Sequence, residues 1–273
     1  MEFYKSLSSL LKVLKGIAVS QFHMLERKIK IFDAFSLTVA DFLQGIDTTG
    51  VYHPFLEPKT EAQAVIAITS DSGLLGGLNV QVMKLAFEEL KTQKDILMIV
   101  GERGKIYAQD EHLSFKGFPG VSEETQFDLA LTLRDYVLKK VIDGEVGALR
   151  VIYPRALSLI VQKIERFSPL PYSQVNRESK VPLINLNEFI QESDLADCVE
   201  YLVFFWLGQR FYDLLGQARL AELAARFIHL EESSQRLEDL DKQLKLKYFR
   251  LKHELTDRSM RELFASRLIH GRR

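Results

Sequence analysis

The feature that most constrains the fold of this chain is the stretch from Asp194 to Ile269, which contains no proline. It is far longer than a typical globular helix. Within it, apolar residues recur at steps of three and four, which is typical of a coiled-coil seam. These residues are Leu237, Leu240, Leu244, Tyr248, Leu251 and Leu255. A helix of this length spans roughly 100 Å, so we expect it to need a partner helix.

The first 46 residues also lack proline and predict a second long helix. Its predicted seam consists of Phe3, Leu7, Leu10, Leu14 and Ile17, continued by Met24, Ile31 and Phe35. We therefore expect the two ends of the chain to pair as an antiparallel two-helix coiled coil. Residues 1–32 carry a net charge of +4 and residues 247–273 a net charge of +5, and such a hairpin places these basic ends together at one tip.

The middle of the chain alternates between two kinds of pattern. Short β-branched and apolar runs predict buried strands at 64–70, 96–101, 148–154 and 157–164. Helical patterns fall between them, at about 80–91 and 127–141. This alternation indicates an inserted, Rossmann-like α/β domain with a largely parallel sheet. The predicted parts are 1–55 (N-terminal helix), 56–190 (α/β domain) and 191–273 (C-terminal helix).

Composition excludes several classes of protein. With 36 basic against 37 acidic residues, the chain shows no charge excess that would point to nucleic acid. The single cysteine, Cys198, rules out an internal disulfide framework and makes a reducing, cytoplasmic compartment the default. The six histidines are scattered without metal-binding spacing, so no metal site is expected. The most apolar run, Tyr201–Leu207, is too short to span a membrane, and a buried helix face is expected there.

The run TSDSGLLGGLN, Thr69–Asn79, lies between a predicted strand and a predicted helix. Its glycines could bring backbone N–H groups close to a phosphate, but their spacing matches neither common phosphate-binding fingerprint. We favour a structural turn built by Asp71, Gly73, Gly76, Gly77 and Asn79. Two alternatives stay open: a nucleotide-dependent enzyme that uses the turn Gly73–Asn79, and a coiled-coil scaffold protein.

The same run resembles the turn S-D-x-G-L-C-G-G-L-N of the gamma subunit of F-type ATP synthases, with Leu75 in place of the cysteine. Further resemblances follow in the family's order along essentially the whole chain. They are carried by VLKGIAVSQFHMLER (13–27), VGERG (100–104), VIYPR (151–155), SPLP (168–171), AELAARFIHLEESSQ (221–235) and LKLKYFRLKHELTDRSMREL (244–263). The family's R-Q pair is Lys252-His253 here, and the N-terminal helix starts about ten residues late, so the chain resembles a divergent member.

The resemblance implies a central-stalk (rotor shaft) subunit that has no active site and no cofactor of its own. It couples rotation and ion translocation to ATP synthesis or hydrolysis on a surrounding catalytic ring. The implied partners are the alpha and beta subunits of that ring, an epsilon-type accessory subunit and a membrane rotor ring, at the cytoplasmic face of the membrane. Carried over from the family, the implied ring-contacting residues are Lys15, Arg226, Lys252 and His253.

Overall fold

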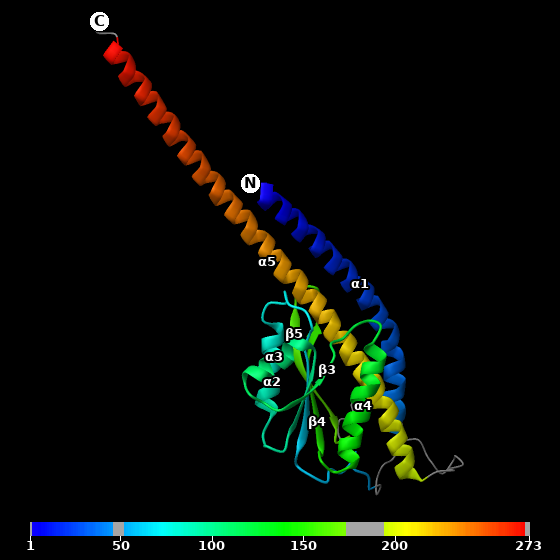
Figure 1. Ribbon diagram of the computed structural model, residues 1–273. Coiled ribbons are helices and arrows are strands. Elements are labelled where there is room, and N and C mark those ends of the chain that lie inside the picture. The colour runs from blue at the N-terminus through cyan, green and yellow to red at the C-terminus, as the bar shows by residue number, and fades with distance from the viewer. Residues whose placement is uncertain (1, 46–51, 173–193, 271–273) are drawn as a thin grey trace. The chain divides into compact units, whose positions relative to one another are not determined.

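The computed structural model describes residues 2–45, 52–172 and 194–270 (Figure 1). The chain divides into two compact units: residues 17–229, and residues 1–16 together with residues 230–273. Two long helices, α1 (Glu2–Gly45) and α5 (Leu195–His270), contribute to both units. The predicted domain boundary at 190 lies outside the described residues, and the three-part division stays a prediction. None of the described helices combines the length and the apolarity that crossing a membrane requires.

A five-stranded sheet, in the order β3-β2-β1-β4-β5, forms the centre of the unit of residues 17–229. Its strands are β1 (Gln63–Ile68), β2 (Ile96–Val100), β3 (Phe115–Phe118), β4 (Ala148–Ala156) and β5 (Gln162–Leu170). The first four strands are parallel, and β5 pairs antiparallel with β4. The predicted α/β domain with a largely parallel sheet is therefore confirmed.

The predicted strand at 157–164 is wrong over its first five residues. Residues 157–161 form the turn between β4 and β5, which is closed by hydrogen bonds from the Leu157 and Ser158 N–H groups to the Val161 carbonyl. The apolar run LSLIV looks like a strand because hydrophobicity alone does not report a turn. The short edge strand β3 was not predicted, since its four residues are too few to show a period.

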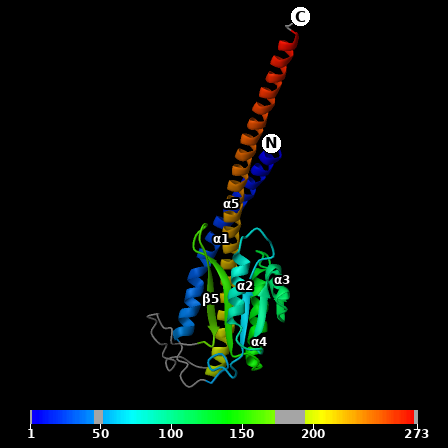
Figure 2. The same ribbon diagram turned by 90° about the vertical axis from the view of Figure 1, so that its left-hand side faces the viewer.

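Helices cover both faces of the sheet (Figures 1 and 2). They are α2 (Leu78–Glu89), α3 (Glu102–Asp110) and α4 (Gln126–Ile142), together with part of α5. Alternate residues of β1 serve the two faces: Ile66 packs in the cluster that holds α4 and α5, and Val65 packs in the cluster that holds α2. Because the strand is buried on both sides, it is apolar along nearly its whole length.

The first half of α5 is a core element of this unit. Val203, Leu207 and Phe211 are fully buried in the same cluster as Leu133 of α4 and Val151 of β4. The steps of four between these α5 residues place them on one face of the helix. The expectation that the run Tyr201–Leu207 provides a buried helix face is confirmed.

The predicted seam of α1 is wrong in register. Of its large members that the structure describes, Leu7 is half-buried and the others are exposed: Phe3, Leu10, Leu14, Ile17 and Met24. Ile31 and Phe35 lie outside the residues whose side chains are described. The buried positions are instead Ala18 and Phe22, and Phe22 packs against α5 at Leu220, Leu223 and Ala224. The prediction followed steps of three and four from Phe3. In the structure the buried positions of the helix pair are Ala18 and Phe22, and Leu25 and Ile29 pack beside Phe22.

In the unit of residues 1–16 and 230–273, the two helices run antiparallel, as expected. Nearer the N-terminus, side chains of both helices line a groove of about 340 Å³: Tyr4, Ser8, Ser9, Lys12, Leu237, Glu238 and Asp241. At the other end of this unit, Lys15 Nζ lies 2.5 Å from Glu231 Oε2. With equal rise per residue, the start of α1 at Glu2 lies beside about residue 244 of α5.

The α5 helix therefore continues without α1 beside it. Every described residue from 242 to 263 is exposed, and of the predicted C-terminal seam only Leu237 is buried. The prediction that the two basic ends meet at one tip is wrong. The start of α1 lies beside the middle of this part of α5, and α5 continues well beyond it (Figure 1). The remainder of the seam, including Leu244 and Leu251, faces solvent in the isolated chain.

The register of the helix pair can be tested with Phe22→Ala and Met24→Ala, two changes on the same helix. Phe22 is 4% exposed and Met24 is 51% exposed. We expect Phe22→Ala to lower the free energy of unfolding by about 3 kcal/mol, since it leaves a cavity against α5. Met24→Ala should change it by less than about 0.5 kcal/mol. Urea unfolding followed by circular dichroism measures both changes. Equal losses in the free energy of unfolding would contradict the observed register and support the predicted seam.

Candidate functional site

The run Thr69–Asn79 forms the connection between β1 and α2, at the carboxyl end of the central strand. The Asn79 side chain closes this turn through both of its polar atoms. Its Oδ1 accepts a hydrogen bond from the Ser70 N–H at 3.2 Å, and its Nδ2 donates to Ser70 Oγ at 2.9 Å. Asn79 and Ser70 are both buried, so their polar groups satisfy each other inside the protein.

Asp71 serves a neighbouring helix. Its Oδ1 accepts a hydrogen bond at 2.9 Å from the N–H of Glu102, the first residue of α3. A carboxylate at this position satisfies an otherwise unpaired N–H group and lies at the positive end of the helix dipole. A Cβ at Gly120 would lie 2.3 Å from the Asp71 carboxylate, so the aspartate is closely approached by the backbone there. Its role in the structure is to hold α3.

The three glycines of the turn differ in what the backbone requires. Gly76 has a φ of +58°, a left-handed conformation in which a side chain is strained. Gly73 has ordinary φ, but a Cβ there would lie 3.0 Å from the Arg103 guanidinium. Gly77 has neither constraint, since its φ is −90° and a Cβ at this position would lie 3.8 Å from its nearest neighbouring atom. The predicted turn therefore depends most on Gly76.

The space beside the turn is too small for a nucleotide. The cavity lined by Thr69, Ser70, Asn79 and Glu222, among others, has a volume of about 10 Å³. That is room for about one water molecule, whereas small-molecule sites occupy several hundred Å³. The alternative of a nucleotide-dependent enzyme at Gly73–Asn79 is therefore not favoured.

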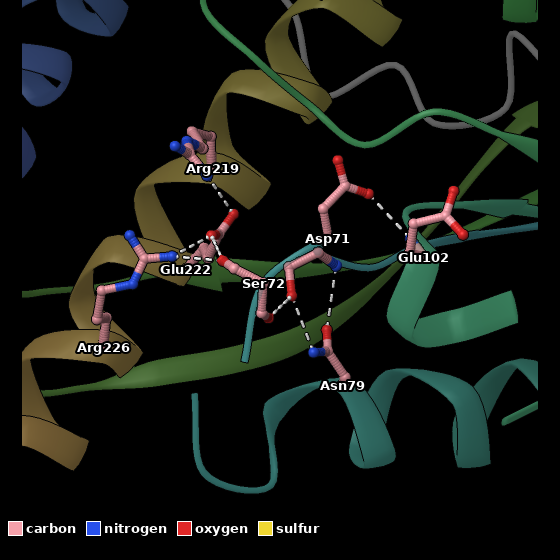
Figure 3. A network of polar contacts seen from close by, with 8 residues as sticks. Asp71, Ser72, Asn79, Glu102, Arg219, Glu222 and Arg226 are labelled. Carbon is pink, nitrogen blue, oxygen red and sulfur yellow. Dashed lines mark hydrogen bonds and ion pairs between the residues drawn. The ribbon is translucent and has the colours of Figure 1, made fainter. Parts of the chain in front are cut away.

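A buried carboxylate joins the turn to α5 (Figure 3). The Glu222 side chain is only 7% exposed and accepts hydrogen bonds at both oxygens. Arg226 Nη2 donates to Oε1 at 2.6 Å, and Arg219 Nη1 donates to Oε2 at 2.6 Å. Two guanidinium groups offset the desolvation of one carboxylate, which makes its burial tolerable.

Ser72 brings the glycine turn into this cluster. Its hydroxyl donates to Glu222 Oε1 at 3.0 Å and accepts from Arg226 Nη2 at 2.6 Å. Beside it, Leu75 and Leu78 pack against Ala225 of α5 and Ile164 of β5. The turn is thus fastened to one helix by a charged cluster and by apolar packing.

Of the Glu222 cluster, only Arg226 was predicted from the sequence as a functional residue; Ser72, Arg219 and Glu222 were not. The spacing of Arg219, Glu222 and Arg226 on one helix face is the signal that could have found Arg219, because residues three and four apart are neighbours on a helix. Nothing in the sequence connected Ser72 with α5, since its partners lie 150 or more positions along the chain.

The four residues predicted to contact a ring have different surroundings. Arg226 belongs to the Glu222 cluster, with 22% of its side chain exposed. Lys15 pairs with Glu231, and both side chains are partly exposed. Lys252 and His253 lie on the exposed part of α5. The role of all four toward a ring stays a prediction.

The chain is similar to known proteins over nearly its whole length. The family described as ATP synthase matches residues 1–260. The ATP synthase gamma chain of Clostridium acetobutylicum is 26% identical over 249 residues, which cover 88% of this chain and 83% of that protein. The gamma chain of Symbiobacterium thermophilum is 22% identical, over 95% of this chain and 92% of that protein.

Solved structures share the fold. A chain in the rotor of Euglena gracilis mitochondrial ATP synthase, in rotational state 1, superposes with a TM-score of 0.67 at 17% identity. The superposition covers 93% of this chain and 95% of that chain. A chain of the central stalk and c-ring structure of Tetrahymena thermophila mitochondrial ATP synthase superposes with a TM-score of 0.61 at 17% identity, over 82% of this chain and 99% of that one.

The importance of the buried cluster can be tested with Glu222→Ala. We expect a loss of about 2 kcal/mol in the free energy of unfolding, since the change removes the acceptor for two arginines and Ser72. The arginines can still reach water, which limits the loss. Glu123→Ala is the control, because Glu123 forms an exposed ion pair with Lys28 and should contribute less than about 0.5 kcal/mol. Equal effects in urea unfolding would show that the cluster adds no stability.

Proposed function

The chain belongs to the ATP synthase family as a gamma chain, and we propose accordingly that it is the central-stalk (rotor shaft) subunit of an F-type rotary ATPase. In this role it couples rotation and ion translocation to ATP synthesis or hydrolysis on a surrounding catalytic ring. Its partners in the proposal are the alpha and beta subunits of that ring, an epsilon-type accessory subunit and a membrane rotor ring.

One observation carries the mechanical part of this proposal: α5 extends past the start of α1 as a single exposed helix. Residues 242–263 include the large apolar side chains Leu244, Leu251 and Leu255, which are all exposed in the isolated chain. A single helix with exposed apolar residues is stabilised when another protein surrounds it. A ring of subunits is such a partner.

The chain supplies no ATP chemistry in this proposal. An asymmetric shaft contacts each catalytic subunit of the ring differently, and each contact favours one of that subunit's states. Rotation then exchanges the states, because a partner shifts a conformational equilibrium only by its differential contact free energy. The ring binds the nucleotide, and the shaft determines which subunit is open.

Lys15, Arg226, Lys252 and His253 are the proposed ring-contacting residues. The exposure of Lys252 and His253 supports their part in the proposal. Arg226 keeps 22% of its side chain accessible even within the Glu222 cluster. Basic side chains at these positions suit an acidic inner surface, where complementary charge guides docking more than it adds affinity.

The proposed organisation keeps three parts, 1–55, 56–190 and 191–273. The α/β domain forms the foot, which faces the membrane rotor ring and the accessory subunit at the cytoplasmic face of the membrane. The scaffold alternative explains the paired helices but leaves the five-stranded sheet and its two covered faces without a role.

Reconstitution tests the proposed function directly. We expect that adding this chain to its cognate alpha and beta subunits raises ATP hydrolysis several-fold, because the shaft is needed for the catalytic sites to exchange states in turn. Steady-state ATPase assays with and without the chain measure this. An activity that neither requires the chain nor changes with it contradicts the proposal.

The ring contacts are tested with Lys252→Ala and His253→Ala in the assembled, membrane-bound complex. Both side chains are exposed, so folding should be unchanged, whereas ATP-driven ion pumping should fall about two- to fivefold through lost docking contacts. Lys84→Ala on α2 is the control, since it removes an exposed charge outside the helix segment that the ring is proposed to surround, and it should leave pumping unchanged. Pumping that is unaltered by both changes counts against the assignment of these residues.

A further inference from the structure

The turn between β4 and β5 carries an exposed apolar surface that the shaft role does not explain. We call residues 157–161 the hairpin tip. Leu157 is 59% exposed, Ile160 70% and Val161 50%. No charged residue occurs in the tip, whose sequence is LSLIV. Exposing several large apolar side chains to water on one short turn is energetically unfavourable. Such apolar patches mark sites of contact with other molecules.

The hairpin tip is held in one conformation. The Leu157 N–H donates to the Val161 carbonyl at 2.9 Å, and Ser158 Oγ accepts from the N–H groups of Ile160 and Val161 at 3.3 and 3.1 Å. Leu159 is partly buried and packs in the cluster that contains Phe22 of α1. A surface that is ordered before binding loses little conformational entropy when a partner covers it.

The place of the hairpin tip indicates its partner. Through Ala156 and Leu159, the hairpin packs against α5 at residues 220–224, which closely precede Arg226. At its base, Ile164 contacts the cluster of Leu75 in the glycine turn. Figure 2 shows the end of the β4–β5 hairpin and the loop that leads into α2 at the same end of the sheet. The tip is therefore next to a proposed ring contact, and it lies at the end of the sheet away from the first turns of α5.

The charges beside the tip do not define its partner. Of the two flanking charged residues nearest in sequence, Lys163 and Arg155, the arginine pairs with Glu165 of the same hairpin at 3.3 Å. The tip therefore offers a mainly apolar surface, which fits an apolar surface on the partner.

We propose that the hairpin tip is a second contact surface for the catalytic ring, covered by an apolar surface of the ring subunits as the shaft turns. This inference rests on the proposed function and names a contact for it outside the long helices. The tip is an ordered, uncharged surface, so it can pass from one ring subunit to the next without breaking ion pairs.

The test is the rate at which the full chain dissociates from its cognate ring of alpha and beta subunits. We expect Ile160→Asp to speed dissociation about tenfold or more, since it places a charge in an apolar contact. The matched control is Ile106→Asp on α3, where the isoleucine is 47% exposed but far from the hairpin in the sequence. It should leave the rate unchanged. Thermal unfolding of both variants verifies that each is folded.

Equal dissociation rates for Ile160→Asp and the unchanged chain overturn the inference while the proposed function stands. A chain that fails to bind the ring at all contradicts the proposed function instead. A photo-crosslinking residue at position 160 of the assembled complex gives an independent measurement. Adducts with the ring subunits support the proposal, whereas adducts only with an accessory subunit, or none, overturn it.

Discussion

The structure depends on one helix that is part of two different environments. In its first half, α5 is buried in the core of the α/β unit through Val203, Leu207 and Phe211. The same continuous helix then runs on to His270, and from residue 242 to residue 263 all its described residues are exposed. Because a helix transmits force along its hydrogen-bonded backbone, the buried half anchors the exposed half. The sheet and the glycine turn contact α5 where it is buried, and α1 contacts it both there, through Phe22, and further along, at Glu231.

Two kinds of contact hold α5 to the sheet, and they resist different movements. Apolar packing, such as that of Leu75 on Ala225, is non-directional and allows small slides. The Glu222 cluster is directional, because each carboxylate oxygen accepts at a fixed distance from an arginine or from Ser72. In the proposed shaft, the directional cluster suits the part of α5 that packs on the sheet. The exposed residues 242–263 combine apolar side chains with seven lysines or arginines and three acidic residues, and their ion pairs, such as that of Arg258 with Glu262, join neighbours on the same helix.

Prediction from the sequence succeeds where the local pattern of apolar residues decides which secondary structure forms and whether it is buried. The strands at 64–68 and 96–100 are apolar on both faces, so their burial can be inferred without knowing any neighbour. The glycine turn can be recognised because its glycines lie between a strand pattern and a helix pattern. The short β3 and the helix α3 were missed, since each is too brief to show a period. The run LSLIV has the composition of a strand, and apolar residues at a turn are rare unless something else covers them.

The residues alone establish that two long helices flank an α/β domain and that the chain resembles the gamma-chain family, because helix length, strand burial and motif order are local properties. Only the tertiary structure decides which face of α1 packs on α5. Whether Phe22 or Met24 is buried depends on the shape of the α5 surface opposite. The point where the pairing stops also needs the fold, because it follows from the register of Lys15 with Glu231 and not from either helix alone. The cluster of Ser72, Glu222 and Arg226 also depends on the tertiary structure, because folding brings residues 150 positions apart into hydrogen-bonding distance.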